Sequence, residues 1–415
     1  MRFFNRLCCV VVMSVLWATM ATASMPALTP MMAACETLDP TTGVFTGAQQ
    51  PDLYIDLLRG QRVALFSNQT GIVGYDRGTP VHTLDLMLHC GLNVVTIFSP
   101  EHGFRGTADA GEHVGSSVDE PTGIPIASLY DGKRSGPSPE TMSLFDVLVV
   151  DIQDVGLRYY TYYVTMINLM EACAASDKAV VVLDRPNPNG MTVDGPILDM
   201  RLRSGVGRLP IPIVYGMTMG ELALMANGEG WLKDNLHVDK LTVIPCKGYT
   251  HATRYRLPVA PSPNLPNMTS IYLYPSLCYF EGTAVSLGRG TDKPFQVYGH
   301  PDMTGYSFSF TPRSVAGAKN PPQLDNLCHG EDLSGISDDE AIAMGVNLEY
   351  VINAYRNLGT GKQFFTKFFD LLTGDRSVRL MIMAGMSADE IKASWADDVA
   401  DFRRQRAPYL LYPEQ

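Results

Sequence analysis

The alternation of two kinds of segment between residues 51 and 250 is the feature that most constrains the fold. Short runs rich in Val, Ile and Leu ("RVALFSN", "NVVTIFSP", "DVLVVDIQD", "AVVVLDRPN", "LTVIPCKG") alternate with helical patterns such as "VHTLDLMLHCG", "YTYYVTMINLMEACAASD" and "MTMGELALMANGEG". Near-continuous apolar strands separated by helices are typical of a parallel sheet that helices cover on both faces. We therefore predict an open α/β fold with a mostly parallel sheet.

Helix-boundary signals agree with this pattern and also distinguish the C-terminal part. Gly91 stands where one helix should end, and Thr218 with Glu221 forms a capping box that opens another. Further capping boxes occur at residues 337–340 and 387–390. From about residue 300 onward, the sequence therefore predicts a smaller, helix-rich α+β domain.

The first 23 residues are typical of a signal peptide. Arg2 and Arg6 precede an apolar run, Leu7–Met20, and the "ATA" that follows supplies the small residues that a signal peptidase accepts. The apolar run is short for a membrane span, so we expect no stable membrane insertion after cleavage, with a retained anchor as the alternative. Export would place the protein in the periplasm or outside the cell.

Residues 24–50, rich in Ala, Thr, Met and Pro, have no usable period and are expected to form a tether, with the folded part beginning near Pro51. Of eight cysteines, Cys8 and Cys9 fall in the signal peptide. The other six are widely spaced, without a C-x-x-C pattern, so zinc is not indicated, whereas export permits one or two disulfides.

The net charge of −11 and the pI near 5.2 give no positive field for a phosphate backbone. Lys and Arg are scattered along the sequence rather than clustered. We therefore expect no nucleic-acid partner.

Polar residues follow several of the predicted strands. In open parallel sheets, ligands bind beyond the carboxyl ends of the strands, where loops and helix N-termini converge. Any one of these residues, Asp184 or Asn187 for instance, also suits a helix cap or a turn. Together they predict a site; they are Asn68, Gln69, Thr70, Glu101, His102, Asp151, Gln153, Asp154, Arg158, Asp184, Arg185, Asn187, and Tyr215 after "IPIV".

Motif searches narrow the chemistry at this edge. No dinucleotide-binding or phosphate-binding glycine loop is present, so we expect no nucleotide cofactor. The G-x-S-x-G, S-x-x-K and H-E-x-x-H signatures are also missing from the sequence. Carboxylates therefore remain as the reactive groups, and we expect no resident metal.

Carboxylates beside amides, aromatic residues and arginines suit glycoside hydrolysis, in which an acid protonates the leaving oxygen and a second group meets the oxocarbenium-like centre or its water. Glu101 is the first candidate for the acid, because it follows an apolar strand between Pro100 and Phe104 and desolvation raises a carboxyl pKa. His102 is the alternative acid, or else a neighbour that orients Glu101 or the sugar.

Several motifs together resemble one family. In order, "LFSNQTG", "FSPEHGFRG", "VVDIQDVGLRYYTYYVTM", "VLDRPNPNG", "YGMTMGELA", "PSPNLPN" and "EGTAVSLGRGTDKPFQVYGHP" resemble the NamZ-type exo-β-N-acetylmuramidases, glycoside hydrolase family 171. The resemblance implies a Rossmann-like domain over residues 51–265, an auxiliary domain over 266–415, and an active site in the cleft between them. It also implies release of N-acetylmuramic acid (MurNAc) from the non-reducing end of peptidoglycan fragments.

The family motifs assign roles to particular residues. The glutamate of "PEHG" is the expected catalytic residue, which is Glu101 here, and the glutamate before "GT" makes Glu281 the candidate second carboxylate. Asp151 and Asp154 are candidates for a base or stabiliser, or for groups that hold a ligand hydroxyl. Where the family often has Asn after "EGT", this chain has Ala284.

The shape of the implied substrate points to further residues. MurNAc carries a lactyl carboxylate, which a guanidinium matches through two parallel hydrogen bonds. Arg158, Arg185 and Arg289 are candidates for this contact, each with carboxylate pairing in the scaffold as the alternative. Tyr160 and Asn264 complete the predicted sugar-binding set.

Two other classes of protein use similar residues. A noncatalytic periplasmic binding protein for muropeptides would employ the same arginines, amides and aromatic residues. A metal-dependent hydrolase would place Asp151, Asp154 and Asp184 around a divalent ion.

Overall fold

The structure, a computed structural model, describes residues 43–74, 80–100, 104, 117–129, 136–359 and 361–415. The predicted signal peptide, most of the predicted tether, Glu101 and His102 lie outside these ranges.

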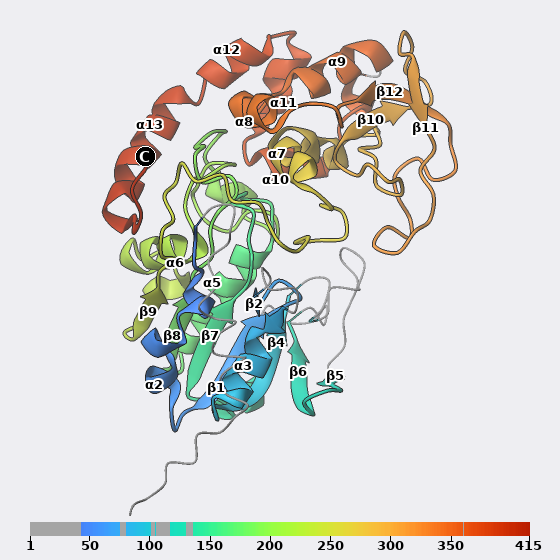
Figure 1. Cartoon of the computed structure of the whole chain (residues 1–415). Helices are drawn as coiled ribbons and strands as arrows, with labels where there is room; N and C mark the ends of the chain where they lie inside the picture. Colours follow the sequence, from blue (N-terminus) through green and yellow to red (C-terminus); the bar gives the residue numbers. More distant parts are fainter. Residues whose placement is uncertain (1–42, 75–79, 101–103, 105–116, 130–135, 360) are drawn as a thin grey trace, which may run out of the picture.

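A seven-stranded sheet forms the centre of the α/β region, in the order β5–β6–β4–β1–β7–β8–β9 (Figure 1). All neighbouring strands are parallel except β5, which is antiparallel to β6. Counted along the chain, the six parallel strands lie in the order 3-2-1-4-5-6, which is the order of Rossmann folds. The strands are β1 (Arg62–Ser67), β4 (Asn93–Ser99), β5 (Ser117–Asp119), β6 (Ile124–Ser128), β7 (Val147–Asp151), β8 (Ala179–Leu183) and β9 (Leu241–Ile244).

Alternate residues of the parallel strands enter two hydrophobic cores. In β1, Ala64 and Phe66 join the core that contains α5 (Tyr162–Ala174) and α6 (Met219–Gly228). Val63 and Leu65 join the core of α2 (Ile55–Leu58) and α3 (Thr83–His89) on the other face. Helices therefore cover both faces, as the near-continuous apolar strands predicted.

The C-terminal region is helix-rich and contains a three-stranded antiparallel sheet, β10–β12–β11 (Figure 1). Its elements are α7 (Met268–Leu277), β10 (Val297–His300), β11 (Phe308–Phe310), β12 (Cys328–Asp332), α8 (Asp338–Met344), α9 (Glu349–Leu358), α10 (Lys367–Thr373), α11 (Arg376–Met383), α12 (Ala388–Ala393) and α13 (Ala396–Arg406). The α/β region also has β2 (Ile72–Val73), β3 (Val81–His82) and α4 (Pro139–Ser143). The 3₁₀ helices are η1 (Gly47–Gln49), η2 (Pro51–Leu53), η4 (Met200–Leu202), η5 (Lys233–Asn235), η6 (Cys278–Gly282), η7 (Gly361–Gln363) and η8 (Ala407–Tyr409).

The helix-start signals read from the sequence are confirmed. Reciprocal capping boxes open α6, α8 and α12 at Thr218, Ser337 and Ser387. Gly91 follows the end of α3 with a φ of 74°, the left-handed conformation that glycine adopts most easily. Local chemistry alone was therefore enough to place these helix ends.

Two expectations differ from the structure. The folded part begins before Pro51, because Phe45 and Lys247 pair through their backbones and the N–H of Gly47 donates to the carbonyl of Asp184 at 2.8 Å. The strand expected at "IPIV" is absent, and only isolated bridges form at Val214. Proline at 210 and 212 removes the N–H donors that a strand needs at those positions.

No helix in the described ranges combines the length and the apolar character that crossing a membrane requires. The five cysteines within these ranges, Cys90, Cys173, Cys246, Cys278 and Cys328, are free thiols.

The C-terminal segment, residues 407–415, packs against the α/β region, because α13 runs back toward α6 (Figure 1). The Tyr412 hydroxyl donates to Asp184 Oδ2 at 2.6 Å and accepts from the Cys246 N–H at 2.8 Å. The backbone N–H of Leu411 donates to Glu221 Oε1 at 2.8 Å. These buried contacts make the last residues of the chain part of the fold.

We expect Tyr412→Phe to lower the free energy of unfolding by about 1–3 kcal/mol, because it leaves the buried N–H of Cys246 without its acceptor and removes one of the two hydroxyl donors to Asp184 Oδ2. Urea unfolding monitored by circular dichroism measures this change. Tyr409→Phe, which removes a largely exposed hydroxyl bound to Glu229, serves as the control and should change stability by less than about 0.5 kcal/mol. Equal effects of the two substitutions would contradict this role for the C-terminal segment.

Candidate active site

A cavity of about 640 Å³ lies between the start of α5 and the C-terminal region. Its size is within the usual range for small-molecule sites. Residues from four parts of the chain line it: Tyr159–Tyr162, Ser262–Leu265, the Tyr274–Phe295 part of the C-terminal region, and the loop 317–322, with Phe368 and Val206. Four of the predicted site residues are among them, namely Tyr160, Asn264, Glu281 and Arg289.

An ion pair supplies the charge in this cavity. Arg289 donates from Nε to Glu281 Oε1 at 2.7 Å, and its Nη2 lies 2.5 Å from the same oxygen. The guanidinium also lies over the ring of Phe295, with 5.0 Å between Cζ and the ring centroid. The side chains of Glu281 and Arg289 are 22% and 17% exposed, so both remain accessible from the cavity.

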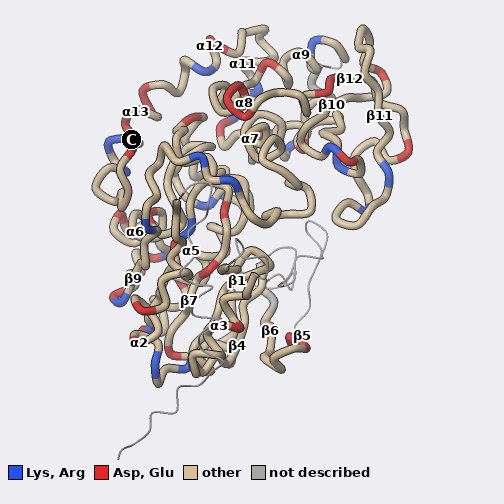
Figure 2. Tube along the Cα trace, in the orientation of Figure 1, with Lys and Arg blue, Asp and Glu red and all other residues tan. Residues whose placement is uncertain are grey.

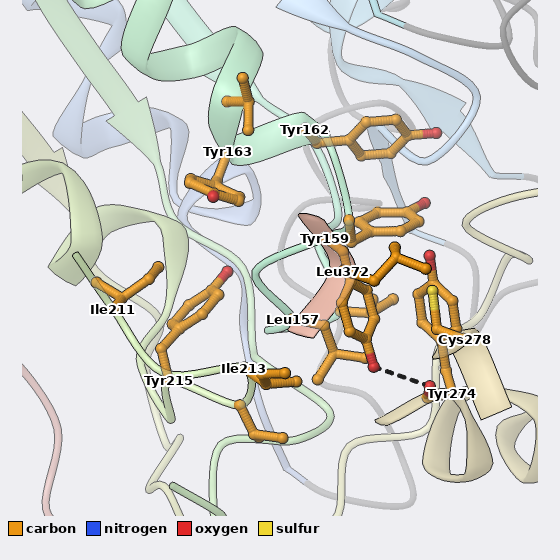
Figure 3. Close-up of a cluster of buried hydrophobic side chains, with 14 of the residues drawn as sticks. Leu157, Tyr159, Tyr162, Tyr163, Ile211, Ile213, Tyr215, Tyr274, Cys278 and Leu372 are labelled. Carbon is orange, nitrogen blue, oxygen red and sulfur yellow. Dashed lines mark hydrogen bonds between the residues drawn. The ribbon is translucent and has the colours of Figure 1, made fainter. Parts of the chain in front are cut away.

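Tyrosines form the cavity wall on the α5 side. The hydroxyls of Tyr160 and Tyr162 both donate to the carbonyl of Pro261 at 2.9 Å. Tyr159 donates to the carbonyl of Tyr274 at 2.9 Å, a bond that ties this wall to α7 (Figure 3). Burial raises the pKa of Tyr159 and Tyr160 well above the usual value, so both remain hydrogen-bond donors.

Asn264, on the loop before α7, donates from Nδ2 to the carbonyl of Gly317 at 2.9 Å. This bond joins the Ser262–Leu265 turn to the 317–322 loop. Asn264 therefore shapes the cavity by holding two lining loops together.

The end of β1 forms a tight turn next to β7. Asn68 Oδ1 accepts from the Thr70 backbone N–H at 2.9 Å, and Thr70 Oγ1 accepts from the N–H of Gln153 at 3.0 Å. Gln69 donates from Nε2 to the carbonyls of Ala260 and Pro261 at 3.3 and 3.4 Å. Gln69 thus connects the sheet edge to the loop that precedes the cavity-lining Ser262.

Asp151 and Arg185 neutralise each other within the sheet edge. Arg185 donates to both carboxylate oxygens of Asp151 at 2.7 and 3.0 Å, and both side chains are almost fully buried. Arg185 also donates to the carbonyl of Ile72 at 3.2 Å. In the sequence, Asp151 is a candidate for catalysis and Arg185 a candidate for binding the lactyl carboxylate. The structure instead shows a buried bidentate pair that holds both side chains in the scaffold.

Asp154 is buried and only partly satisfied. Its Oδ1 accepts from the Gly156 N–H at 2.8 Å and from the Tyr215 hydroxyl at 3.0 Å, whereas Oδ2 has no hydrogen-bond partner in the described part of the chain. Burial raises the pKa of this carboxyl to about 7. Asp154, Arg185 and Asn187 border a small space of about 10 Å³, which is separate from the large cavity.

Asp184 and Asn187 organise the chain around α6. Asp184 accepts from Thr218 Oγ1 at 2.6 Å and from the Gly220 N–H at 2.8 Å, and burial raises its pKa to about 6. Asn187 donates to the carbonyl of Met217 at 2.8 Å. Both are engaged by turns and a helix start, which is the alternative that the sequence left open for them.

Arg158 differs most from its predicted role. Its side chain is fully buried, and Nη1 and Nη2 donate to four carbonyls at 2.6–3.2 Å. Two of these carbonyls, of Leu372 and Thr373, belong to α10 in the C-terminal region. Arg158 therefore cross-links the two regions, and a substrate carboxylate cannot reach it without breaking this cluster.

The structure also shows residues that the sequence did not single out. Lys319 and the two prolines after Asn320 line the cavity from a loop between β11 and β12, and Phe295 packs against Arg289. The proline pair in "AKNPPQ" was the available signal for a shaped loop. Within the described residues, no group of three His, Cys, Asp or Glu side chains is arranged to hold a metal ion.

Comparison with known proteins identifies the family of the chain. The models for "Exo-beta-N-acetylmuramidase NamZ, N-terminal" and "Exo-beta-N-acetylmuramidase NamZ, C-terminal" match residues 63–269 and 272–412. The chain belongs to the NamZ family. It is an enzyme of the glycosidase class, as its motifs indicated.

Relatives of this NamZ-family chain include a curated protein and two solved structures. The peptidoglycan β-N-acetylmuramidase NamZ of Bacillus subtilis is 36% identical over 380 residues, covering 87% of this chain and 89% of that protein. A DUF1343 family protein of Bacteroides fragilis is 59% identical, with a TM-score of 0.83, covering 90% of this chain and 99% of that one. A second protein of that organism is 29% identical, with a TM-score of 0.74 and shares of 90% and 100%. The Rossmann-like fold and the family resemblance are therefore confirmed.

We expect Asp154→Asn to flatten the dependence of stability on pH. The folded-state pKa of about 7 lies above the ordinary 3.8, so the folded protein keeps a proton that the unfolded chain loses. The resulting stability is fully present below pH 3.8 and is lost as pH rises through 7, a change of about 4 kcal/mol.

Urea unfolding of wild type and variant at intervals between pH 4 and 8 measures this difference. Asp56→Asn, at an exposed position, is the control and should leave the pH dependence unchanged. Parallel pH profiles for wild type and Asp154→Asn would contradict a protonated Asp154 in the folded protein.

Proposed function

We propose that this NamZ-family glycosidase is an exo-acting β-N-acetylmuramidase that releases MurNAc from the non-reducing end of peptidoglycan fragments. The cavity with its Glu281–Arg289 pair is the observation that carries this proposal, since it joins the α5 wall to the C-terminal region. The Bacillus subtilis relative, named as a peptidoglycan β-N-acetylmuramidase, supports the same substrate.

Arg289 is the arginine we assign to the lactyl carboxylate. Arg158 and Arg185 are engaged by carbonyls and by Asp151, whereas Arg289 lines the cavity and pairs with a residue that also lines it. Glu281 binds Arg289 through Oε1, and its Oε2, which accepts from the Cys278 thiol at 3.8 Å, has a further lone pair for a sugar hydroxyl. The ion pair suits Glu281 to the role of a charged partner rather than a proton donor.

Aromatic and amide groups complete the sugar site. Tyr160 and Phe295 supply aromatic rings to the cavity lining, and Asn264 joins two of the loops that line it. An exo-acting enzyme needs a pocket that is closed at one end, and the 317–322 loop with Phe368 supplies a wall from the C-terminal region. The division into a catalytic domain, residues 51–265, and an auxiliary domain, 266–415, belongs to the same proposal.

We assign proton donation to the leaving oxygen to Glu101, which follows β4 in the "PEHG" motif and lies outside the described residues, with His102 as its neighbour. A carboxyl group after a buried strand can keep the proton that this step requires. We further propose export through the N-terminal signal sequence, residues 1–23, which would bring the enzyme to peptidoglycan saccharides in the periplasm or outside the cell.

We expect Glu101→Gln to lower kcat on MurNAc linked to N-acetylglucosamine (MurNAc-GlcNAc) by about 10²–10⁴-fold with little change in KM, because the amide cannot protonate the sugar alcohol that leaves. A chromogenic β-MurNAc glycoside, whose phenolate leaves with little protonation, should be affected much less. Reading the anomer of the first product by NMR adds the stereochemical course. Glu349→Gln, at an exposed position of α9, is the control and should retain wild-type kcat. A near wild-type kcat for Glu101→Gln on MurNAc-GlcNAc would contradict the assignment, and a wild type without turnover would favour a binding protein.

We expect Arg289→Met to raise KM for MurNAc glycosides by about 10–100-fold while changing KM for the matching β-N-acetylglucosaminide much less, because the latter has no lactyl carboxylate. Steady-state kinetics on both substrates measure the two ratios. Arg313→Met, which removes an exposed arginine paired with Asp325, is the control. An equal rise in KM on both substrates would show that Arg289 does not recognise the lactyl group.

A further inference from the structure

The strand order of the sheet reverses between β1 and β7, which is where Rossmann-like folds bind ligands. The Asn68 turn, residues 68–71, occupies this point directly after β1. The N–H of Gly71 donates to the carbonyl of Asn68 at 3.0 Å, which closes the turn. A Cβ atom at Gly71 would meet Ser67 Oγ at 2.1 Å, so a larger residue here would displace the Ser67 side chain.

The hydrogen bonds of this turn fix the orientation of the Asn68 amide. Asn68 Oδ1 accepts from the backbone N–H of Thr70, a group that can only donate. Thr70 Oγ1 accepts from the N–H of Gln153 and therefore directs its own proton to Asn68 Oδ1, at 2.6 Å. Asn68 Nδ2 is thus identified without ambiguity, and among the described residues this buried donor has no partner.

His82, at the end of β3, forms a hydrogen bond to the Asn68 turn. Its Nε2 lies 2.8 Å from the carbonyl oxygen of Asn68, and its Nδ1 accepts from the N–H of Leu84 at 3.1 Å. A carbonyl can only accept and a backbone N–H can only donate, so His82 is the neutral tautomer with the proton on Nε2. One ring therefore caps α3 through Nδ1 and fastens Asn68 through Nε2.

His82 also contacts the segment that follows β4. Its ring packs edge-on against Phe104, with 4.9 Å between the centroids, and both side chains are buried. Phe104 belongs to the "SPEHGFRG" motif that the family resemblance singled out. The contacts of His82 thus join the turn after β1 to a residue of the motif after the neighbouring strand β4.

We propose that His82 is a positioning residue of this glycosidase, which holds the Asn68 turn through its Nε2–H so that the Asn68 amide is directed at an oxygen of the sugar. The inference rests on the proposed function for the identity of the ligand. It goes beyond that function because His82 touches no substrate and acts through Asn68. The unpartnered Nδ2 at the switch point is the donor that this arrangement keeps in place.

Two substitutions distinguish the hydrogen bonds made by the two ring nitrogens of His82, because each keeps one bond and removes the other. In His82→Asn, Oδ1 replaces Nδ1 as the α3 cap, but the side chain at position 82 no longer reaches the Asn68 carbonyl, which keeps the Gly71 N–H as a donor. In His82→Gln, Nε2 of the amide replaces the donor to Asn68, but the cap acceptor is lost. A purely structural role predicts that activity follows stability, so that His82→Asn is the more active variant. The positioning role predicts the reverse order.

Steady-state kinetics on the chromogenic MurNAc glycoside measure this order. We expect His82→Asn to lower kcat/KM by about tenfold, and His82→Gln to stay within about threefold of wild type although it melts at a lower temperature. His237→Asn, which changes an exposed histidine, is the control for both measurements. Activities that follow the melting temperatures would overturn the inference.

Hydrogen exchange tests the same contact without activity. The Gly71 amide should exchange about tenfold faster in His82→Asn and not in His82→Gln, whereas the Leu84 amide should show the opposite pattern. An inactive wild type with this crossed pattern would refute the proposed function and still support the hold of His82 on the turn. Unchanged Gly71 exchange in His82→Asn would overturn the inference even if the enzyme is active.

Discussion

The buried guanidinium of Arg158 is the interaction on which the rest of the structure depends. It donates to carbonyls of Pro196 and Ile211 in the α/β region and of Leu372 and Thr373 in the C-terminal region. Removing it would take a donor from all four carbonyls, of which Ile211 keeps the N–H of Leu198 as a second donor, and each buried acceptor left unsatisfied costs about 1–3 kcal/mol. Arg158 directly precedes the tyrosines of the cavity wall, so the same bonds that join the two regions also fix that wall.

The charged side chains of this molecule act in neighbouring pairs and do not form large regions of one sign. Figure 2 shows Lys and Arg interspersed with Asp and Glu along the described chain. Within the protein, Asp151 neutralises Arg185 and Glu281 neutralises Arg289, and only the second pair lines the cavity. We assign recognition of an anionic sugar to the guanidinium of Arg289, whose geometry is set by Glu281 and Phe295, while Lys319 is a second basic residue on the cavity lining.

Sequence reasoning predicted what depends on local pattern and failed where distant contacts decide. Apolar runs and capping boxes predicted the sheet and the helix starts, because strand burial and cap chemistry are local properties. The same reasoning could not distinguish the three arginines, since the partners of Arg158 lie 38 to 215 residues away. His82 carried no motif of its own; its role follows from the turn after β1, which the sequence did not place beside it.

The most direct test of the account is a crystal structure of the protein with a non-hydrolysable MurNAc-GlcNAc thioglycoside. We predict that the non-reducing MurNAc occupies the cavity, with its lactyl carboxylate within hydrogen-bond distance of Arg289 and the GlcNAc directed toward solvent. Saccharide bound outside the cavity, or bound in it with the reducing end innermost, would contradict an exo-acting muramidase built on this site.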